Sequence, residues 1–256
     1  MSQSQIYKVL SILKKHKVKA LLIGGQAAIL YGASEFSRDI DFAILLDQNN
    51  LHRIELALRE LKAEQIYFPS LQMEYLERGH ACHFRCKLPE IYDFRVDIMG
   101  KLRGCEDFEV LWKRREIITV LSGINVNVIS LSDLVQSKKT QRDKDWYMIK
   151  RLVEADILHS KKISKEKLEW WFMECRTPEL LIDLANKYPI AAKKNSKKRP
   201  SVKYAIKADI SKLSETITKE EKIERKKDVK YWAPLKKELE EMRRIKQQLS
   251  DCRRAV

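Results

Sequence analysis

Long apolar runs are missing from this sequence of 256 residues, and so is any surplus of the residues that break regular structure. No run approaches the roughly 18 apolar residues of a membrane span, and no long apolar core follows the basic N-terminal stretch. We therefore expect neither a membrane anchor nor a signal peptide. Only seven glycines and six prolines are present, which argues against extensive disorder.

Cysteine is also scarce. Its five copies are an odd number in a chain this long, so we expect no disulfide framework and a reducing compartment, the cytoplasm. The stretch HACHFRC invites comparison with a zinc site, but strand alternation puts His80, Cys82, Phe84 and Cys86 on one face, as in a core stripe. No second ligand pair stands at a suitable spacing, so the sequence favours packing over zinc binding.

Positive charge is what the sequence has in excess. The formal net charge is +15, and residues 191–256 hold 21 Lys and Arg against 10 Asp and Glu. This segment contributes +11, which leaves +4 for the rest of the chain. Such a local concentration indicates an anionic partner, either nucleic acid or nucleotide phosphates, although a solvated charged surface has the same composition.

Hydrophobic periodicity predicts helices interleaved with strands in the first half of the chain. The expected helices are residues 4–16, 26–31, 51–61 and 106–116. The expected strands are residues 19–24, 39–46, 80–88 and 93–99, with a hairpin at 117–130 around Ser122 and Gly123. This alternation predicts an α+β fold, a mixed sheet with flanking helices.

Strand patterns stop near Ser130. Ser130 and Asp133 form a capping-box-like start to a helical region that we expect to reach about His159. Residues 193–203, KKNSKKRPSVK, are interpreted as a basic linker or exposed turn, and a final amphipathic helix is expected after Pro234.

The change of pattern near residue 130 also predicts two domains. Residues 1–129 are expected to form the domain that contains the sheet. Residues 130–256 are expected to form an α-helical, basic C-terminal domain.

Two aspartates and two glycines stand close together in the first half. Asp39 and Asp41 project from one face of an otherwise apolar strand, where two carboxylates would repel each other unless a cation lay between them. Mg²⁺ prefers one or two carboxylates together with substrate phosphates. Gly24 and Gly25 end one strand and open a helix, where free backbone N–H groups favour anions.

A second metal that activates a hydroxyl would require a third acid. Asp93, Arg95 and Asp97 share one face of a later strand by parity, so alternation alone does not choose between the two aspartates. We favour Asp97, because RVDIM is the apolar strand itself and Asp93 lies nearer the preceding turn.

This arrangement resembles the nucleotidyltransferases of the DNA polymerase β superfamily. Both have a strand, two glycines, a short helix, a D-x-D motif that opens a second strand and a third Asp on a later strand. The later stretch SLSDLVQSKKTQRDKDW resembles the helix of AbiEii and MenT-like members, toxins of toxin–antitoxin and phage-defence modules. The resemblance covers residues 20–152 and implies a polymerase β-like fold for the first domain.

The resemblance implies a role for each acid and glycine. Gly24 and Gly25 would hold a triphosphate, and Asp39 and Asp41 would ligate Mg²⁺ or Mn²⁺. Asp97 would be the third ligand and catalytic acid, which positions or deprotonates the attacking hydroxyl.

It also implies nucleotide contacts beyond the acids. Lys138, Arg142 and Asp145 stand at i, i+4 and i+7, one face of a helix. Lys138 would contact phosphate and contribute to catalysis, and Asp145 would orient it or a base. Ser37 would also lie at the nucleotide, but many relatives have Thr there and Arg where this chain has Glu35.

The sequence thus predicts a nucleotidyltransferase that moves a nucleoside monophosphate from an NTP to a hydroxyl. The positive C-terminal segment favours RNA as acceptor, a tRNA 3′ end above all, and the resemblance adds a possible toxin role with an antitoxin partner. Two alternatives remain open: a protein or a small antibiotic-like molecule as acceptor, and a non-catalytic module that binds RNA or a partner.

Overall fold

The computed structural model describes residues 3–33, 37–120 and 123–254, and it divides into two compact units. The sheet unit comprises Met1–Leu30, Ser34–Ser137 and Tyr231–Val256. The helical unit comprises Tyr31–Ala33 and Lys138–Lys230. Whether the chain folds as two independent domains divided at residue 130 stays a prediction.

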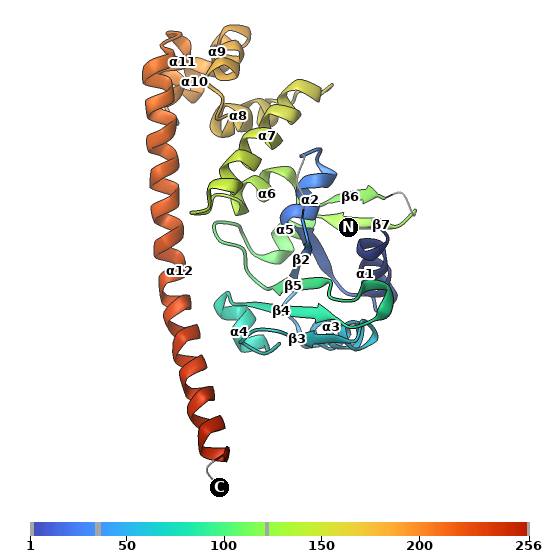
Figure 1. Ribbon diagram of the computed structural model, residues 1–256. Helices are drawn as coiled ribbons and strands as arrows, with labels where there is room; N and C mark the ends of the chain where they lie inside the picture. The colour runs from blue at the N-terminus through green and yellow to red at the C-terminus, as the bar shows by residue number, and fades with distance from the viewer. Residues whose placement is uncertain (1–2, 34–36, 121–122, 255–256) are drawn as a thin grey trace. The chain divides into compact units, whose positions relative to one another are not determined.

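A mixed sheet is the centre of the sheet unit (Figure 1). Its described strands are β1 (Ala20–Ile23), β2 (Asp39–Ile44), β3 (Ala63–Gln65), β4 (Ala81–Cys86), β5 (Arg95–Met99), β6 (Glu116–Thr119) and β7 (Asn125–Val128). Their order is β3-β4-β5-β2-β1-β7-β6. β2 pairs in parallel with β5 and β1 with β7, whereas the other neighbours are antiparallel. The predicted α+β class is confirmed, and so is the hairpin, of which Ser122 lies outside the described residues.

Helices connect these strands at most of the expected places. The helical segments of the sheet unit before its last one are α1 (Gln3–Lys15), α2 (Gly24–Leu30), α3 (Gln48–Glu60), α4 (Met73–Arg78), the 3₁₀ turn η1 (Pro89–Ile91), α5 (Phe108–Arg114) and α6 (Leu131–Ser137). At the start of α6, the Ser130 hydroxyl accepts from the Asp133 amide at 3.2 Å and donates to its carboxylate at 2.6 Å. The predicted capping interaction is therefore confirmed.

Strand register determines what each face of the sheet carries. Leu22 pairs with Phe42 and Ile23 with Asp41 between β1 and β2. Because side chains alternate along a strand, the two pairs lie on opposite faces. Leu13 of α1 lines the same cavity as Phe42, so α1 covers the Phe42 face. The Asp41 face is the one that the acids share.

The helical unit differs from the sequence prediction at its start. Its helices are α7 (Asp143–His159), α8 (Lys165–Glu174), α9 (Pro178–Lys187), α10 (Pro189–Asn195), α11 (Ser201–Ile206) and the first part of α12 (Ile210–Arg254). The helical region expected from Ser130 to His159 is interrupted, because residues 138–142 lie between α6 and α7.

Two further expectations are wrong. Residues 193–203 are not a linker, because α10 and α11 take up both ends of the segment, although the turn between them exposes Lys197 and Lys198. Arg199 is 4% exposed and donates to the carbonyls of Phe172 and Cys175 at 2.9 and 2.8 Å. Burial is possible because Glu220 pairs with the guanidinium. The last helix does not begin after Pro234 either, since α12 passes through this residue. None of the helices in the described ranges is both long and apolar enough to cross a membrane.

The C-terminal part of α12 is fixed to the sheet unit by a polar contact. His80, 1% exposed, lies 2.9 Å from the Glu238 carboxylate through its Nε2 atom, and Arg78 also pairs with Glu238. The hydrogen bond from His80, followed by the bond from Arg78, holds the pKa of Glu238 below its ordinary value of 4.5. This contact therefore stabilises the folded state while Glu238 is ionised.

We expect Glu238→Gln to lower the melting temperature at pH 7 by about 1–3 °C. Because the pKa of Glu238 is lower in the folded chain, its contribution is complete above about pH 4.5 and is lost as pH falls through the folded value. The difference between wild type and variant should thus disappear at acid pH. Glu240→Gln, an exposed change on the same helix, is the control. A difference that persists unchanged at pH 3 would contradict this account.

Candidate functional site

The two parallel strands β2 and β5 bring three aspartates together. Their register pairs Asp41 with Asp97 directly, and Asp39 is two residues before Asp41 on the same face. One carboxylate oxygen from each of Asp39, Asp41 and Asp97 lies within 4.8 Å of the others. Asp97 is 4% exposed, and the other two are half-buried. Clustered carboxylate oxygens are the ligands that hard divalent cations prefer.

Arg95 supplies positive charge to this cluster, and both Arg95 and His83 lie within hydrogen-bond distance of Asp97. Arg95 donates to both oxygens of Asp97, at 2.7 Å from Nε and 2.7 Å from Nη2. His83 lies 2.9 Å from Asp97 through Nδ1. The hydrogen bond from Arg95 to Asp97 raises the pKa of Arg95, and the charges of Asp39 and Asp41 act in the same direction.

Sequence reasoning placed Arg95 on the acidic face and assigned no role to Arg95 or to His83. The signal for Arg95 was strand parity with Asp97. His83 pairs with Asp97 in the antiparallel register of β4 and β5, which no local pattern predicts.

The alternative third acid, Asp93, lies elsewhere. It occupies the turn before β5 with φ +65°. Both of its carboxylate oxygens accept from Arg85, at 2.9 and 3.0 Å, and the side chain is 54% exposed. Asp93 is therefore engaged at the surface, and Asp97 is the aspartate that meets Asp39 and Asp41.

Gly24 is pressed against the carboxylate of Asp41. It ends β1 and begins α2 with φ +69°, a conformation that side chains disfavour. A Cβ atom at this position would lie 1.9 Å from Asp41 Oδ2 and 2.9 Å from Asp41 Cβ. Gly25 is buried in the first turn of α2. The close approach explains the glycine at position 24 directly.

Ser37 contacts the cluster from the loop before β2. Its hydroxyl donates to Asp39 Oδ1 at 2.8 Å and lies 3.1 Å from the Asp39 carbonyl. Ser37 thus orients an acid, a role that the hydroxyl of threonine could equally perform. Glu35, the other departure from the family pattern, lies outside the described residues.

Lys138, Arg142 and Asp145 meet in the helical unit, but not on one helix face as predicted. Only Asp145 lies within a helix, in the first turn of α7, where it is 0% exposed. Lys138 Nζ lies 3.4 Å from Asp145 Oδ1, and Arg142 Nε donates to Oδ2 at 2.8 Å. Thr140, which sequence reasoning missed, also donates to Asp145. Three residues of the segment between α6 and α7 therefore contact the buried Asp145 carboxylate.

The cysteine stripe of β4 belongs to the core, as alternation predicted. Cys82, Phe84 and Cys86 are buried, whereas His83 faces the carboxylate cluster. Burial raises the pKa of the Cys82 thiol to about 12 and that of Cys86 to about 11. These thiols remain protonated at neutral pH and act as small apolar side chains.

Comparison with other proteins gives distant structural similarity. No family model and no curated protein matches the chain. A candidate nucleotidyltransferase from Thermotoga maritima is 21% identical, with 60% of this chain and 87% of that chain covered and a TM-score of 0.37. The antibiotic-resistance factor ANT(2'')-Ia is 14% identical, with 76% and 96% covered and a TM-score of 0.38. A candidate nucleotidyltransferase from H. pylori is 14% identical, with 90% and 98% covered and a TM-score of 0.38. At these values the likeness assigns no activity to this chain, so its function is argued from the carboxylate cluster.

Proposed function

We propose that the chain is a Mg²⁺-dependent nucleotidyltransferase that transfers a nucleoside monophosphate from an NTP to a hydroxyl of RNA, a tRNA 3′ end above all. One observation carries the proposal: Asp39, Asp41 and Asp97, from two neighbouring parallel strands, converge within 4.8 Å. The contact of Gly24 with Asp41 supports it, because a glycine there leaves room beside the carboxylate.

The residues present fit a divalent cation. The guanidinium of Arg95 pairs with Asp97, and the charges of Asp39 and Asp41 also raise its pKa, which supports a cation-binding role for the cluster. Asp39 and Asp41 would hold Mg²⁺ or Mn²⁺, which when bound would neutralise charge on the phosphoryl oxygens.

Side chains of the protein would position and deprotonate the hydroxyl and contact the nucleotide. Asp97 orients the attacking hydroxyl and accepts its proton, while the oxygen of that hydroxyl bonds to the α-phosphorus and pyrophosphate leaves. Ser37 fixes the orientation of Asp39 through its hydrogen bond. From the resemblance, Lys138 is the proposed phosphate contact and Arg142 a proposed nucleotide contact, while Asp145 would orient Lys138 or a base.

Arg95 should stabilise the metal-free cluster, and its loss gives a test of cation binding. We expect Arg95→Gln to cost about 1–2 kcal/mol without metal, because three carboxylates then repel each other and Arg95 is one third exposed. Mg²⁺ should raise the melting temperature more in the variant than in wild type. Arg85→Gln, which removes only the surface pair with Asp93, is the control. Equal Mg²⁺ effects in all three proteins would count against metal binding here.

A row of lysines on one face of α12 indicates the chemistry of the acceptor. Lys212, Lys219, Lys222, Lys226 and Lys230 follow one another at spacings of seven, three, four and four residues, which places them on one helix face. At 1.5 Å per residue this stripe is about 27 Å long. Lys219 pairs with Glu215 at 2.5 Å and Lys212 with Asp209 at 3.7 Å, so part of the charge is neutralised within the chain.

A continuous row of cations fits the phosphates of RNA. A small cationic acceptor of the antibiotic type would instead require an acidic surface. The stripe therefore favours RNA over that alternative.

Incubation with each α-labelled NTP, Mg²⁺ and an acceptor pool tests the reaction directly. We expect label in RNA from a total RNA pool, concentrated in tRNA, and no label in an aminoglycoside or in cell protein. Charge reversal at Lys222 and Lys226 should weaken RNA labelling and reduce its salt dependence, whereas reversal at Lys161 and Lys162, exposed outside the stripe, should not. If label appeared in protein or in the antibiotic instead of RNA, that molecule would be the acceptor. Binding of RNA without any label would favour a non-catalytic module.

We also propose a toxin role with an antitoxin partner, which rests on the resemblance of residues 130–146 to AbiEii and MenT-like proteins. Induced expression in a bacterial host should then arrest growth, and the arrest should require Asp39 and Asp41. Growth at the normal rate during active RNA labelling would exclude toxicity under those conditions.

A further inference from the structure

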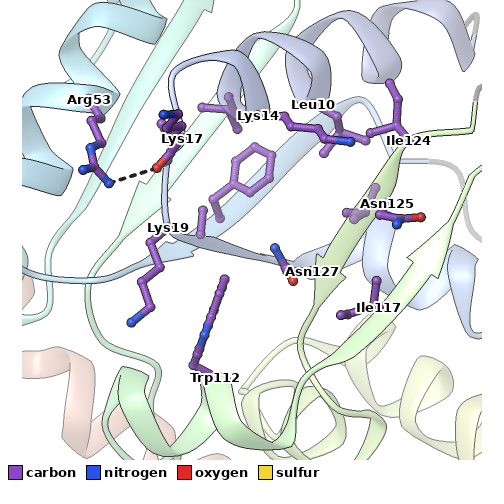
Figure 2. Close-up of a pocket in the computed structure, with 15 residues that line it drawn as sticks. Leu10, Lys14, Lys17, Lys19, Arg53, Trp112, Ile117, Ile124, Asn125 and Asn127 are labelled. Atoms are coloured by element: carbon purple, nitrogen blue, oxygen red, sulfur yellow. Dashed lines mark hydrogen bonds between the residues drawn. The ribbon is translucent and has the colours of Figure 1, made fainter.

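A cavity of about 530 Å³ lies in the sheet unit, away from the carboxylate cluster (Figure 2). It is bounded by α1, the start of β1 and the hairpin of β6 and β7. β1 and β7 have one registered pair, Leu22 with Val128, and Ala20 of β1 and Asn125 of β7 line the cavity. Its volume falls within the range of small-molecule sites, roughly 300–1,000 Å³.

The cavity and the carboxylate cluster lie on different faces of β2. Phe42 lines the cavity, whereas Asp41, its neighbour in sequence, points to the opposite face. None of Asp39, Asp41 and Asp97 is among the described residues that line the cavity. A ligand bound there would not contact the proposed catalytic acids.

Four cationic side chains line the cavity, and its described lining contains no acid. Lys14, Lys17 and Arg53 are exposed, and Arg53 donates to the Lys17 carbonyl at 3.3 Å (Figure 2). Lys19 is more constrained, because it pairs with Glu109 at 2.9 Å and lies 5.2 Å from the Trp112 ring centroid. The charge that remains for a ligand therefore comes chiefly from Lys14, Lys17 and Arg53, which suits an anionic group at the mouth.

The interior has a different chemistry. Trp112 and Phe42 contribute aromatic surface, and Leu13 contributes apolar surface. Two amides, Asn125 and Asn127, also line the cavity. The side-chain Oδ1 atom of Asn127 accepts from Arg115 at 2.9 Å, and that of Asn125 accepts from Thr119 at 2.8 Å. With both oxygens engaged, each amide has its nitrogen available as a donor to a ligand.

We propose that this cavity binds a nucleoside monophosphate, with its phosphate at Lys14, Lys17 and Arg53 and its base between the aromatic wall and the asparagine amides. A nucleoside monophosphate combines an anion, a flat apolar ring and hydrogen-bond acceptors on the ring edge, which are the groups that this lining suits. Because the contacts come from side chains of the protein, binding requires no divalent cation. A free mononucleotide and the terminal nucleotide of an RNA share this chemistry.

Equilibrium dialysis of labelled AMP in EDTA tests the site independently of the proposed catalysis. The protein is the full chain carrying Asp39→Asn and Asp41→Asn, so that metal-dependent binding at the acids is removed. We expect saturable binding of one AMP per chain, weakened by about 10-fold or more in the added double variant Lys14→Glu and Lys17→Glu. The control adds Lys101→Glu and Lys113→Glu, two exposed changes outside the cavity with the same change in charge, and should bind AMP normally.

A second measurement, tryptophan fluorescence, tests whether the base of AMP lies against Trp112. AMP should change the tryptophan fluorescence of the protein, and Trp112→Phe, which keeps an aromatic ring beside Phe108, should remove most of that change. Inorganic phosphate should compete much more weakly than AMP. Stronger competition by a short RNA than by AMP identifies an RNA end as the source, and weaker competition identifies the free nucleotide.

Absence of saturable AMP binding, equal weakening in the control, or equal competition by phosphate would overturn the proposal. Nucleotidyl transfer by wild type is measured separately, so failure of this site leaves the proposed activity standing and the reverse also holds.

Discussion

Replacement of Asp39 and Asp41 together by asparagine is expected to reduce nucleotidyl transfer by about 10³-fold or more. The two side chains would keep their size while losing the charge that holds a cation against the phosphates. The fold should survive, because the change also removes repulsion between carboxylates that lie within 4.8 Å of each other and of Asp97. We therefore expect a metal-free melting temperature equal to or above that of wild type.

Two measurements check this result together. Transfer is followed with labelled NTP and RNA, and thermal unfolding is followed with and without Mg²⁺. Ligand binding to the native state stabilises it by mass action, so the Mg²⁺-dependent rise in melting temperature should be present in wild type and absent from the variant.

Asp93→Asn is the matched control. It is the same substitution in the turn just before β5, but Asp93 contacts Arg85 at the surface and lies outside the cluster. Activity and the Mg²⁺ effect should be unchanged, and the lost surface pair should cost less than about 1 kcal/mol. Substantial transfer by the double variant, or loss of transfer in the control, would contradict the assignment of the acids.

Local periodicity predicted the strands, the flanking helices and the strand face that each acid occupies, whereas the meeting of the three acids was expected from the resemblance to the polymerase β superfamily. Parity along β2 placed Asp39 and Asp41 on one face, and the same rule placed Arg95 beside Asp97. The choice of Asp97 over Asp93 followed from which residue belongs to the strand. The parallel register that joins Asp41 to Asp97 is a long-range pairing, which local pattern does not determine.

The wrong predictions share a physical cause, the dominance of tertiary contacts over local preference. Lys138 and Arg142 fit a helical spacing, but the buried Asp145 carboxylate attracts both of them and Thr140 into an irregular segment. Arg199 belongs to a basic run that suggests exposure, yet in the interior its guanidinium donates to Glu220 and to two carbonyls.

Pro234 shows the same effect on a helix. Proline removes a backbone donor and disfavours a helix interior, so the expectation of a helix start was natural. In the structure α12 continues on both sides, and Leu235 beside the proline is buried. Contacts of the flanking turns, including that of Glu238 with His80, stabilise the helix across this point.

Gly24→Ala is expected to impair both the carboxylate cluster and the stability of the fold. The new Cβ would stand 1.9 Å from Asp41 Oδ2, 2.6 Å from its Cγ and 2.9 Å from its Cβ, so rotation of the carboxylate alone cannot relieve the overlap. Either Asp41 or the backbone between β1 and α2 must move. Since ligand geometry tolerates only small displacements, we expect transfer to fall by about 10²-fold or more. We also expect stability to fall by about 2–4 kcal/mol, from positive φ and overlap together.

Gly32→Ala separates these two causes. Gly32 has φ +88°, so alanine there carries similar backbone strain, but no heavy atom of the described residues lies within 4 Å of the added Cβ. This variant should lose about 1–2 kcal/mol and keep its activity and its response to Mg²⁺. Denaturant unfolding measures the two stabilities, and labelled transfer measures the two activities. The difference between the variants isolates the contact of residue 24 with Asp41, and similar behaviour of both would show that this close approach does not matter for the site.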